Sequence, residues 1–401
     1  MQKRDFFRLI KRFLSFSFLS WLSSVKAHAA WTKIGKTSGS TNTWQKIIYT
    51  SPRISGISIG SGTGLALTSN GKIYAVGKGD YGQLGNNGTS NYSSFTQALG
   101  ISNAISIANS GRHSLALRSD GLVFSCGYGQ SGVLGSGNLL NRSTFAQAIN
   151  ISNIVAITAS RNNSVALDSS GTVWACGDNA SGQLGVNSNT SSVTFVQSTG
   201  ISQAIAISSS GMMRTMALRS DGVVFGSGYN FYGQLGNGST ASRLTFVQAT
   251  GIANIIAISA GYYSAYALGA DGFVYSAGYN GNGELGTGNS SNYSTFVQAT
   301  GISNAVSLAA GSSFCLALRA DGLVFCTGSF ETNSSSTFSQ IAGISNAIAI
   351  SSSDSSGVAF PAAYALRSDG LLFAMGSNSS GVLATGNTNN YSTFVQCLTI
   401  R

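Results

Sequence analysis

The chain has 401 residues, of which 43% are hydrophobic, 8% are charged and 51 are glycine. Length alone would suggest two or three domains. The formal charge is +10, but no lysine follows Lys78 and the arginines are spread along the chain. A nucleic-acid-binding protein usually gathers its basic residues in a patch, so we expect no nucleic-acid partner.

Residues 1–29 have the three parts of a secretory signal peptide. A basic start (MQKRDFFRLIKR) precedes an apolar run (FLSFSFLSWLSSV), and small residues at Ala27 and Ala29 predict cleavage between Ala29 and Ala30. The apolar run is too short to span a bilayer, and no later stretch is long enough, so no membrane span is expected in the mature chain. The signal carries six Lys or Arg and one Asp, so its removal takes +5 of the +10 with it. We expect a secreted or periplasmic protein.

After a lead-in at residues 30–43, one pattern repeats to the end of the chain. LRSDGLVFSCGYGQSGVLG at residues 117–135 returns nearly unchanged at residues 218–236 and 268–286. Its turn glycine recurs about every fifty residues, at Gly71, Gly121, Gly171, Gly222, Gly272, Gly322 and Gly370. A fixed period of this length indicates a repeat architecture, so residues 44–401 are expected to form one domain.

Each repeat contains four short apolar runs. In the second repeat they are residues 145–149, 154–158, 164–167 and 172–176, all rich in β-branched or aromatic residues and separated by Gly, Asn, Ser and Asp. Runs of this length and composition predict strands, and Asp-Gly steps predict tight turns between them. No helical period follows the N-terminus. Seven repeats of four antiparallel strands predict an all-β fold, a seven-bladed β-propeller.

The repeat also resembles that of a known family. ALRSDGLVFSCGYGQSGVLG followed by STFAQAINISNIVAI is similar to the regulator of chromosome condensation repeat, and GQLG recurs at residues 82–85, 182–185 and 233–236. The resemblance covers roughly residues 44–400 and implies a seven-bladed propeller. The Gly-Gly step of kelch repeats and the Trp-Asp signature of the shorter propeller repeat are both missing from the sequence.

The sequence offers little for catalysis. The mature chain has one histidine, His113, whose counterparts in later repeats are Asn163, Arg214, Ser264 and Phe314. We therefore interpret His113 as a structural hydrogen-bonding group at a strand start. Most acidic residues precede the turn glycine, one to a blade, too far apart for paired acid–base work. No metal-binding or phosphate-binding motif occurs, so we expect no enzyme activity, no catalytic residue, no cofactor and no metal.

Five cysteines lie in the repeats. Cys126 and Cys176 occupy the same position in consecutive repeats, where other repeats have small residues, so buried free thiols are expected. Cys315 and Cys326 flank a turn on neighbouring strands. An oxidising compartment would permit a disulfide between them, and the sequence leaves this open.

Strand direction predicts two unlike faces. Antiparallel strands place the GYYS-type and GYNGNGELG-type loops on one face, and the Asp-Gly and GISN turns on the other. After Gly322 the long loop is cut to GSFETNSSS, and the next loop of that face is lengthened to SSSDSSGVAFPAAYAL. Two adjacent changes favour a partner-binding corner, although neutral drift in surface loops would also produce them. The predicted binding residues are Phe330, Glu331, Asp354, Val358, Phe360 and Pro361, with the loop aromatics Tyr229, Phe231, Tyr232, Tyr262, Tyr263 and Phe314.

Three functions remain open from the sequence. The first is a secreted, monomeric, non-catalytic module that binds another protein through its loop face. The second, implied by the family resemblance, is nucleotide exchange on a small GTPase of a host cell. The third is inhibition of a secreted or periplasmic enzyme such as a β-lactamase.

A final expectation concerns ring closure. We expect residues 44–46 and 394–396 to share one composite blade, because a propeller must remove its free edge. Phe394, Val395, Leu398 and Ile400 would then be buried.

Overall fold

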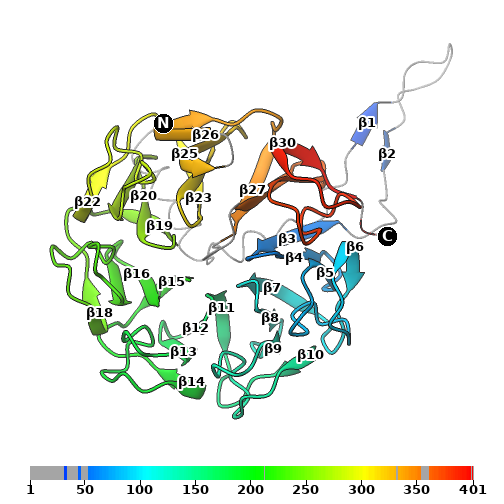
Figure 1. Ribbon diagram of the computed structural model, residues 1–401, viewed down its shortest axis with the longest axis horizontal. Helices are drawn as coiled ribbons and strands as arrows, with labels where there is room; N and C mark the ends of the chain where they lie inside the picture. The colour runs from blue at the N-terminus through cyan, green and yellow to red at the C-terminus, as the bar shows by residue number, and fades with distance from the viewer. Residues whose placement is uncertain are drawn as a thin grey trace.

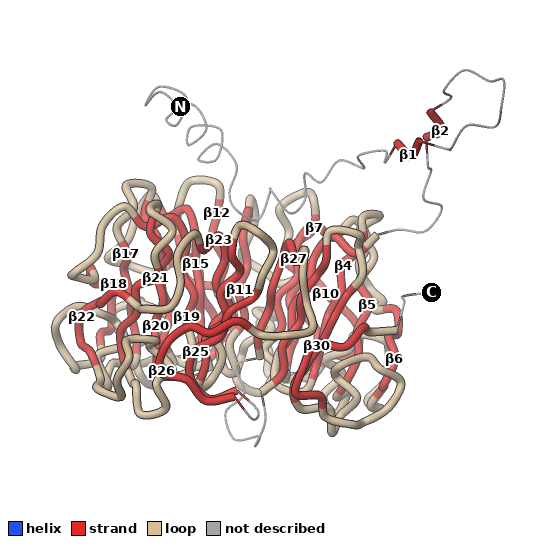
Figure 2. The backbone as a smooth tube through the Cα atoms, turned by 90° about the horizontal axis from the view of Figure 1, so that it is seen from above, coloured by secondary structure: helices blue, strands red, loops and turns tan. Residues whose placement is uncertain are grey.

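The computed structural model describes residues 31–33, 44–46, 53–211, 213–330, 333–353, 361–398 and 400. Seven four-stranded antiparallel sheets stand around a central axis as the blades of a propeller, which confirms the predicted fold (Figure 1). Figure 2 shows this ring edge-on, with the strands running between its two faces. None of the described residues belongs to a helix of the length and apolarity needed to cross a membrane.

Every blade uses four consecutive strands, and the remaining two form a separate pair. The pair is β1 (Trp31–Lys33) and β2 (Trp44–Lys46). Blades 1 to 4 are β3 (Ile54–Ile59), β4 (Thr63–Thr68), β5 (Ile73–Gly77), β6 (Tyr92–Gln97); β7 (Ala104–Asn109), β8 (His113–Arg118), β9 (Val123–Gly127), β10 (Arg142–Gln147); β11 (Ile154–Ala159), β12 (Asn163–Asp168), β13 (Val173–Gly177), β14 (Ser192–Gln197); and β15 (Ala204–Ser210), β16 (Arg214–Arg219), β17 (Val224–Gly228), β18 (Arg243–Gln248). Blades 5 to 7 are β19 (Ile255–Ala260), β20 (Ser264–Gly269), β21 (Val274–Gly278), β22 (Tyr293–Gln298); β23 (Ala305–Ala310), β24 (Phe314–Arg319), β25 (Val324–Phe330), β26 (Asn333–Gln340); and β27 (Ala347–Ser352), β28 (Ala362–Arg367), β29 (Leu372–Gly376), β30 (Tyr391–Gln396).

The first strand of each blade lies nearest the central axis and the fourth lies at the rim (Figure 1). The strands predicted in the second repeat correspond to β10–β13, although β10 begins at Arg142, before the predicted start. Second strands such as β8 are buried along nearly their whole length, because neighbouring blades cover both faces of the sheet. The core is accordingly divided into clusters between blades. Leu84, Ala116 and Phe145 belong to one such cluster.

The turn glycine that marks the repeat has a steric cause. Gly71 has φ +75°, and a Cβ atom there would lie 2.7 Å from the Cα of Asn103 in the next blade. The carbonyl of Gly71 also accepts the N–H of Ala104, at 3.1 Å. Five further blade junctions repeat this hydrogen bond, with acceptor and donor pairs Gly121–Ile154, Gly171–Ala204, Gly222–Ile255, Gly272–Ala305 and Gly322–Ala347. Only glycine permits both the conformation and the close approach.

The expected composite blade is wrong. β2 pairs with β1, and the outer strand of blade 7 is β30 from the C-terminal end, so the described strands leave no blade shared by the two ends. The ring closes by packing of blade 7 on blade 1, where the side chains of Ile59, Tyr364 and Leu383 share one core cluster. Phe394 is buried as expected, but Leu398 is 48% exposed, much like Leu99 (45%) and Ile149 (43%) at the same position of blades 1 and 2.

Candidate functional site

The propeller has two unlike faces, as strand direction predicted. We call the side with the first-to-second and third-to-fourth connections of each blade the loop face. It carries residues 60–62, 110–112, 160–162, 211 and 213, 261–263 and 311–313, with the long loops 78–91, 128–141, 178–191, 229–242, 279–292 and 377–390. The opposite side, with the Asp-Gly turns, is the turn face.

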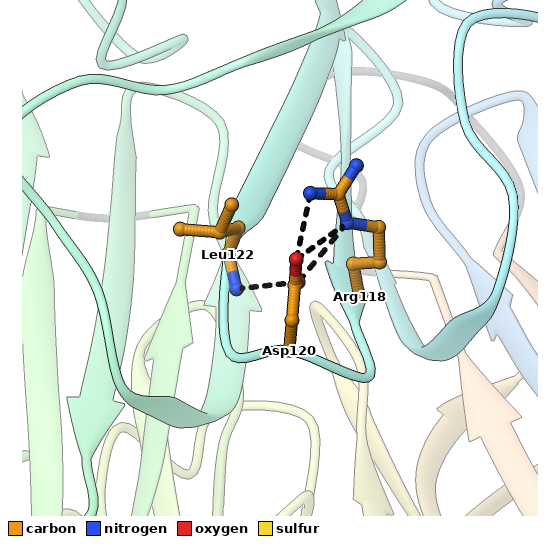
Figure 3. Close-up of polar contacts among 3 residues, drawn as sticks. All are labelled: Arg118, Asp120 and Leu122. Atoms are coloured by element: carbon orange, nitrogen blue, oxygen red, sulfur yellow. Dashed lines mark hydrogen bonds and ion pairs between the residues drawn. The ribbon is translucent and has the colours of Figure 1, made fainter.

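The charged groups of the turn face are satisfied within their own turns. The Asp120 carboxylate accepts Arg118 Nη2 at 2.7 Å and the N–H of Leu122 at 3.3 Å (Figure 3). The bond from Arg118 holds the pKa of Asp120 below its ordinary value. The guanidinium also stacks on Phe124, 4.7 Å from the ring centroid. Blades 4, 6 and 7 repeat the arrangement with Arg219–Asp221, Arg319–Asp321 and Arg367–Asp369. These arginines are engaged in turn structure.

The central channel encloses a cavity of about 220 Å³ lined by all seven innermost strands. Its walls carry small hydroxyl side chains, and several of them join neighbouring blades. Ser208, Ser259 and Ser351 accept backbone N–H groups of the following blade through their Oγ atoms, at 2.9, 3.0 and 3.1 Å. The volume is below the usual 300–1,000 Å³ of small-molecule pockets. We assign the channel a structural role.

His113 occupies a buried position between blades. Its ring nitrogens lie 2.9 Å from Ser110 Oγ and 2.8 Å from Ser164 Oγ in the next blade. Burial lowers the pKa of His113 to about 3, so the imidazole is neutral at physiological pH. The predicted structural role at a strand start is therefore confirmed. In the described ranges, no three His, Cys, Asp or Glu side chains gather as a metal site would require.

Glu284 stands where three other blades have glutamine. Gln83, Gln183 and Gln234 each accept, through Oε1, the backbone N–H two residues earlier, and Glu284 Oε2 accepts that of Asn282 at 2.9 Å. Glu284 is only 1% exposed, and burial raises its pKa from 4.5 to about 7. A carboxylate here is a buried charge, which glutamine avoids.

We therefore expect Glu284→Gln to stabilise the protein in a pH-dependent way. The pKa of Glu284 is higher in the folded than in the unfolded state, so folding stability falls as pH rises from 4.5 to about 7. The variant should gain up to about 3 kcal/mol of unfolding free energy at pH 8 and almost nothing at pH 4. Denaturant unfolding of both proteins at the two pH values measures this, and the contribution of His113 cancels in the difference. An equal gain at both pH values would contradict the assignment.

Aromatic side chains form one continuous cluster on the loop face, where blades 4 and 5 meet. Tyr232 is its centre and makes edge-to-face contacts with Phe231, Tyr263 and Tyr279, with centroids 5.2, 5.0 and 5.0 Å apart. Tyr262 packs on Tyr263 at 4.6 Å. Tyr229 completes the cluster, 6.4 Å from Tyr263. We call these six residues the aromatic patch: Tyr229, Phe231, Tyr232, Tyr262, Tyr263 and Tyr279.

The aromatic patch is both exposed and fixed. Phe231 is 65% exposed, and the other five rings are partly exposed. The backbone beneath them is tied at several points: the N–H of Tyr229 bonds the carbonyl of Met213 at 2.9 Å, and that of Tyr279 bonds the carbonyl of Tyr263 at 3.0 Å. Burial raises the pKa of Tyr229 and of Tyr263, which keeps both phenols neutral. The patch is an uncharged, pre-formed surface.

A buried arginine supports the patch from below. Arg214, at the position of His113 in its blade, is fully buried and donates Nη2 to the carbonyl of Gly261 at 2.8 Å. Its Nη1 reaches the carbonyl of Tyr262 at 3.4 Å. Arg214 thus holds the 261–263 loop of blade 5 from blade 4. Tyr279 and this role of Arg214 were not predicted from the sequence, although the places of both residues in the repeat would have indicated them.

The structure brings together five of the predicted binding residues and separates others. Tyr229, Phe231, Tyr232, Tyr262 and Tyr263 lie in the patch. Phe314 and Phe330 do not belong to any binding surface, because both are fully buried against each other with centroids 4.4 Å apart. They fill the space between blades 6 and 7 that the shortened loop leaves. Pro361 is partly buried. Glu331, Asp354, Val358, Phe360, Ala29 and Ala30 lie outside the described residues.

The disulfide considered for blade 6 does not form. Cys315 pairs with Thr327 and Cys326 with Leu316, so the two thiols point to opposite faces of the sheet. Cys315 packs in the cluster with Tyr266, and Cys326 packs in the cluster with Phe330. All five cysteines are free and buried, as expected for Cys126 and Cys176, and burial raises their pKa values.

Comparisons with known proteins agree with the repeat and the fold. The family model of the RCC1-like domain matches residues 36–300, and that of the regulator of chromosome condensation (RCC1) repeat matches residues 305–334. A comparison with curated proteins finds no match.

Solved structures with the same fold include Prp20p of Saccharomyces cerevisiae, studied for its binding to Gsp1p and histones (TM-score 0.71, 19% identity, 84% of this chain and 88% of that chain). Yeast RCC1 (Prp20) bound to Kap60 is similar (0.71, 18%, 91% and 91%), as is human WBSCR16 (0.71, 18%, 82% and 94%). At such identities the likeness concerns the fold alone.

Proposed function

This chain belongs to the RCC1-like domain family, and on that premise we propose that it is a non-catalytic binding module whose protein partner docks on the loop face. RCC1-like propellers are a protein-interaction fold. The observation that carries the proposal is the aromatic patch. Tyrosine and phenylalanine are typical interface anchors, since they bring a large contact area with little conformational entropy to lose.

The two faces differ in what they offer a partner. Turn-face arginines already pair with aspartates and stack on rings, so a new contact would have to break these interactions. A partner can contact the patch rings without breaking an existing ion pair. Their edge-to-face packing fixes their orientation before binding, which lowers the entropic cost of association. An uncharged patch of this kind suits a partner surface that is mainly apolar, with acceptors for the phenol O–H groups.

The identity of the partner is tested by capture with the purified mature chain. Three outcomes separate the functions that the sequence left open. A partner held without any change in its activity supports a binding module. Capture of a GTPase in its nucleotide-free form, together with faster release of nucleotide from that GTPase when the propeller is added, would support exchange on a host GTPase. A secreted or periplasmic enzyme, such as a β-lactamase, that loses activity on binding would support inhibition.

We also propose that the protein is exported, on the strength of the signal-like sequence of residues 1–29. The mature chain should begin at Ala30, since signal peptidase reads small residues at Ala27 and Ala29. N-terminal sequencing of protein recovered from the periplasm or the medium measures this. Ala29→Phe should block cleavage without altering the propeller. Exported protein that still begins with Met1 would contradict the proposal.

A further inference from the structure

One contact between neighbouring blades recurs along the rim of the loop face. In six blades the long third-to-fourth loop folds over the next blade and donates one backbone N–H to a carbonyl of that blade's outer strand. The bonds are Asn87 to Ser143, Gly137 to Val193, Asn187 to Leu244, Gly238 to Ser294, Gly288 to Ser336 and Gly386 to Ser93, with lengths of 2.8–3.1 Å. The acceptor is the second residue of the outer strand in five blades, and it is the fourth, Ser336, in the longer outer strand β26 of blade 6.

The six contacts use the same few residue types in the same backbone conformation. Every donor is Gly or Asn with positive φ, from 58° at Asn187 to 80° at Gly288. Five residues before each donor, a glycine lies against the same strand. At Gly82, an added Cβ would stand 2.6 Å from the Cα of Ser143, and Gly233 and Gly381 show the same approach to Ser294 and Ser93. The outer strand therefore accepts a glycine turn that carries a left-handed Gly or Asn.

Blade 6 breaks the pattern. Its long loop is replaced by an extended hairpin in which Phe330 pairs with Asn333. Phe330 is fully buried in the cluster between blades 6 and 7, so it fills the core position that a loop leucine such as Leu84 fills elsewhere. Phe330 thus fills the core, but within the described residues no N–H of the third-to-fourth connection of blade 6 bonds a carbonyl of the outer strand of blade 7.

The uncovered strand is β30. Ser392 and Thr393 are both exposed, whereas the equivalent Ser143 and Thr144 are partly buried under a loop. The pairing of β30 with β29 shifts between Tyr391 and Val395, so Ser392 has no partner in that ladder. Its carbonyl accepts no loop N–H within the described part of the chain.

We propose that β30 is a docking slot for a glycine turn of a partner protein. The occupant carries Gly-x-x-(Gly or Ala)-x-(Gly or Asn), and its last residue donates its N–H to the carbonyl of Ser392. This order is common to the six loops that fill equivalent slots, for example residues 82–87 and 381–386. Because Phe330 already occupies the leucine position, the occupant has a small residue there. The loops of a second copy do not serve, since each is already folded onto its own ring.

This slot lies on blade 7 and does not depend on the aromatic patch of blades 4 and 5. The probe is a cyclised, fluorescein-labelled peptide of residues 279–292 with Leu285→Ala. Fluorescence anisotropy with the full chain should detect its binding. The same peptide with leucine retained should bind at least tenfold more weakly, because its leucine would meet Phe330.

Two variants of the propeller test the location. Replacing residues 329–334 by residues 279–292 restores the missing loop and should abolish peptide binding. Ser392→Arg, at an exposed position, is an independent test that does not require the graft to fold, and it should weaken peptide binding at least tenfold. Ser220→Arg on the turn face should leave peptide binding unchanged. Amide resonances of Ser392 and Thr393 should shift when the peptide is added. Undiminished binding to Ser392→Arg, or no binding of the peptide to the parent chain, would overturn the proposal.

Discussion

Removal of residues 391–401 should strongly lower the melting temperature of the propeller. The deletion takes away the outer strand of blade 7 and with it Phe394 and Cys397, both 5% exposed. Phe394 packs with Ile341 and Ile344 in the cluster between blades 6 and 7. Loss of a buried phenylalanine side chain alone costs about 3–5 kcal/mol, which is a large part of the stability of a typical domain.

Point substitutions separate this packing effect from a general effect of truncation. Phe394→Ala should lower the unfolding free energy by about 3–5 kcal/mol. Leu398→Ala, at a side chain that is 48% exposed, should lower it by less than about 1 kcal/mol. Thermal and denaturant unfolding of the three variants provide the comparison. A truncated protein that melts within one or two degrees of the parent would show that β30 contributes little to the stability of the ring.

The second large effect is expected in binding. Phe231→Ala removes the most exposed ring of the aromatic patch, and Tyr232→Ala removes the ring on which three others pack. Each should weaken partner binding by about 2 kcal/mol or more, which is roughly thirtyfold in Kd. Calorimetry or surface plasmon resonance with the captured partner measures the change. Phe231→Ala should melt like the parent, because its ring is 65% exposed.

Tyr81→Ala is the matched control for the patch. Tyr81 occupies the position of Tyr232 in blade 1 and makes a similar edge-to-face contact with Tyr128, at 5.0 Å. Arg118→Ala and Arg319→Ala serve as controls on the turn face and should change binding by less than about 0.5 kcal/mol. If Tyr81→Ala or an arginine variant proves as damaging as Phe231→Ala, the patch has no special part in binding.

The sequence was sufficient for the fold because the repeat determines most of it. The turn glycines recur since Gly71 and its counterparts meet the backbone of the next blade too closely for any side chain. Strand direction then predicted the two faces, and the face carrying Tyr232 and Tyr263 was predicted from the same argument. These inferences depend on local spacing, which the sequence shows directly.

The predictions that were wrong depended on the exact strand register or on which side chain fills a position in the core. Cys315 and Cys326 are on adjacent strands, but the register pairs Cys315 with Thr327, which sends the two thiols to opposite faces. Phe330 was expected at the surface, yet a shortened loop leaves a core position empty and Phe330 fills it. The composite blade was wrong because residues 44–46 pair with residues 31–33, while β30 alone supplies the outer strand of blade 7.

Hydrogen exchange of the propeller alone and in complex with its partner tests the central claim most directly. If the loop face binds the partner, the complex should protect backbone amides in residues 229–242 and 261–263, around the aromatic patch. Exchange in the turns at residues 118–122 and 319–323 should be unchanged. Protection confined to those turns, with residues 229–242 exchanging as in the free protein, would contradict the assignment of the loop face.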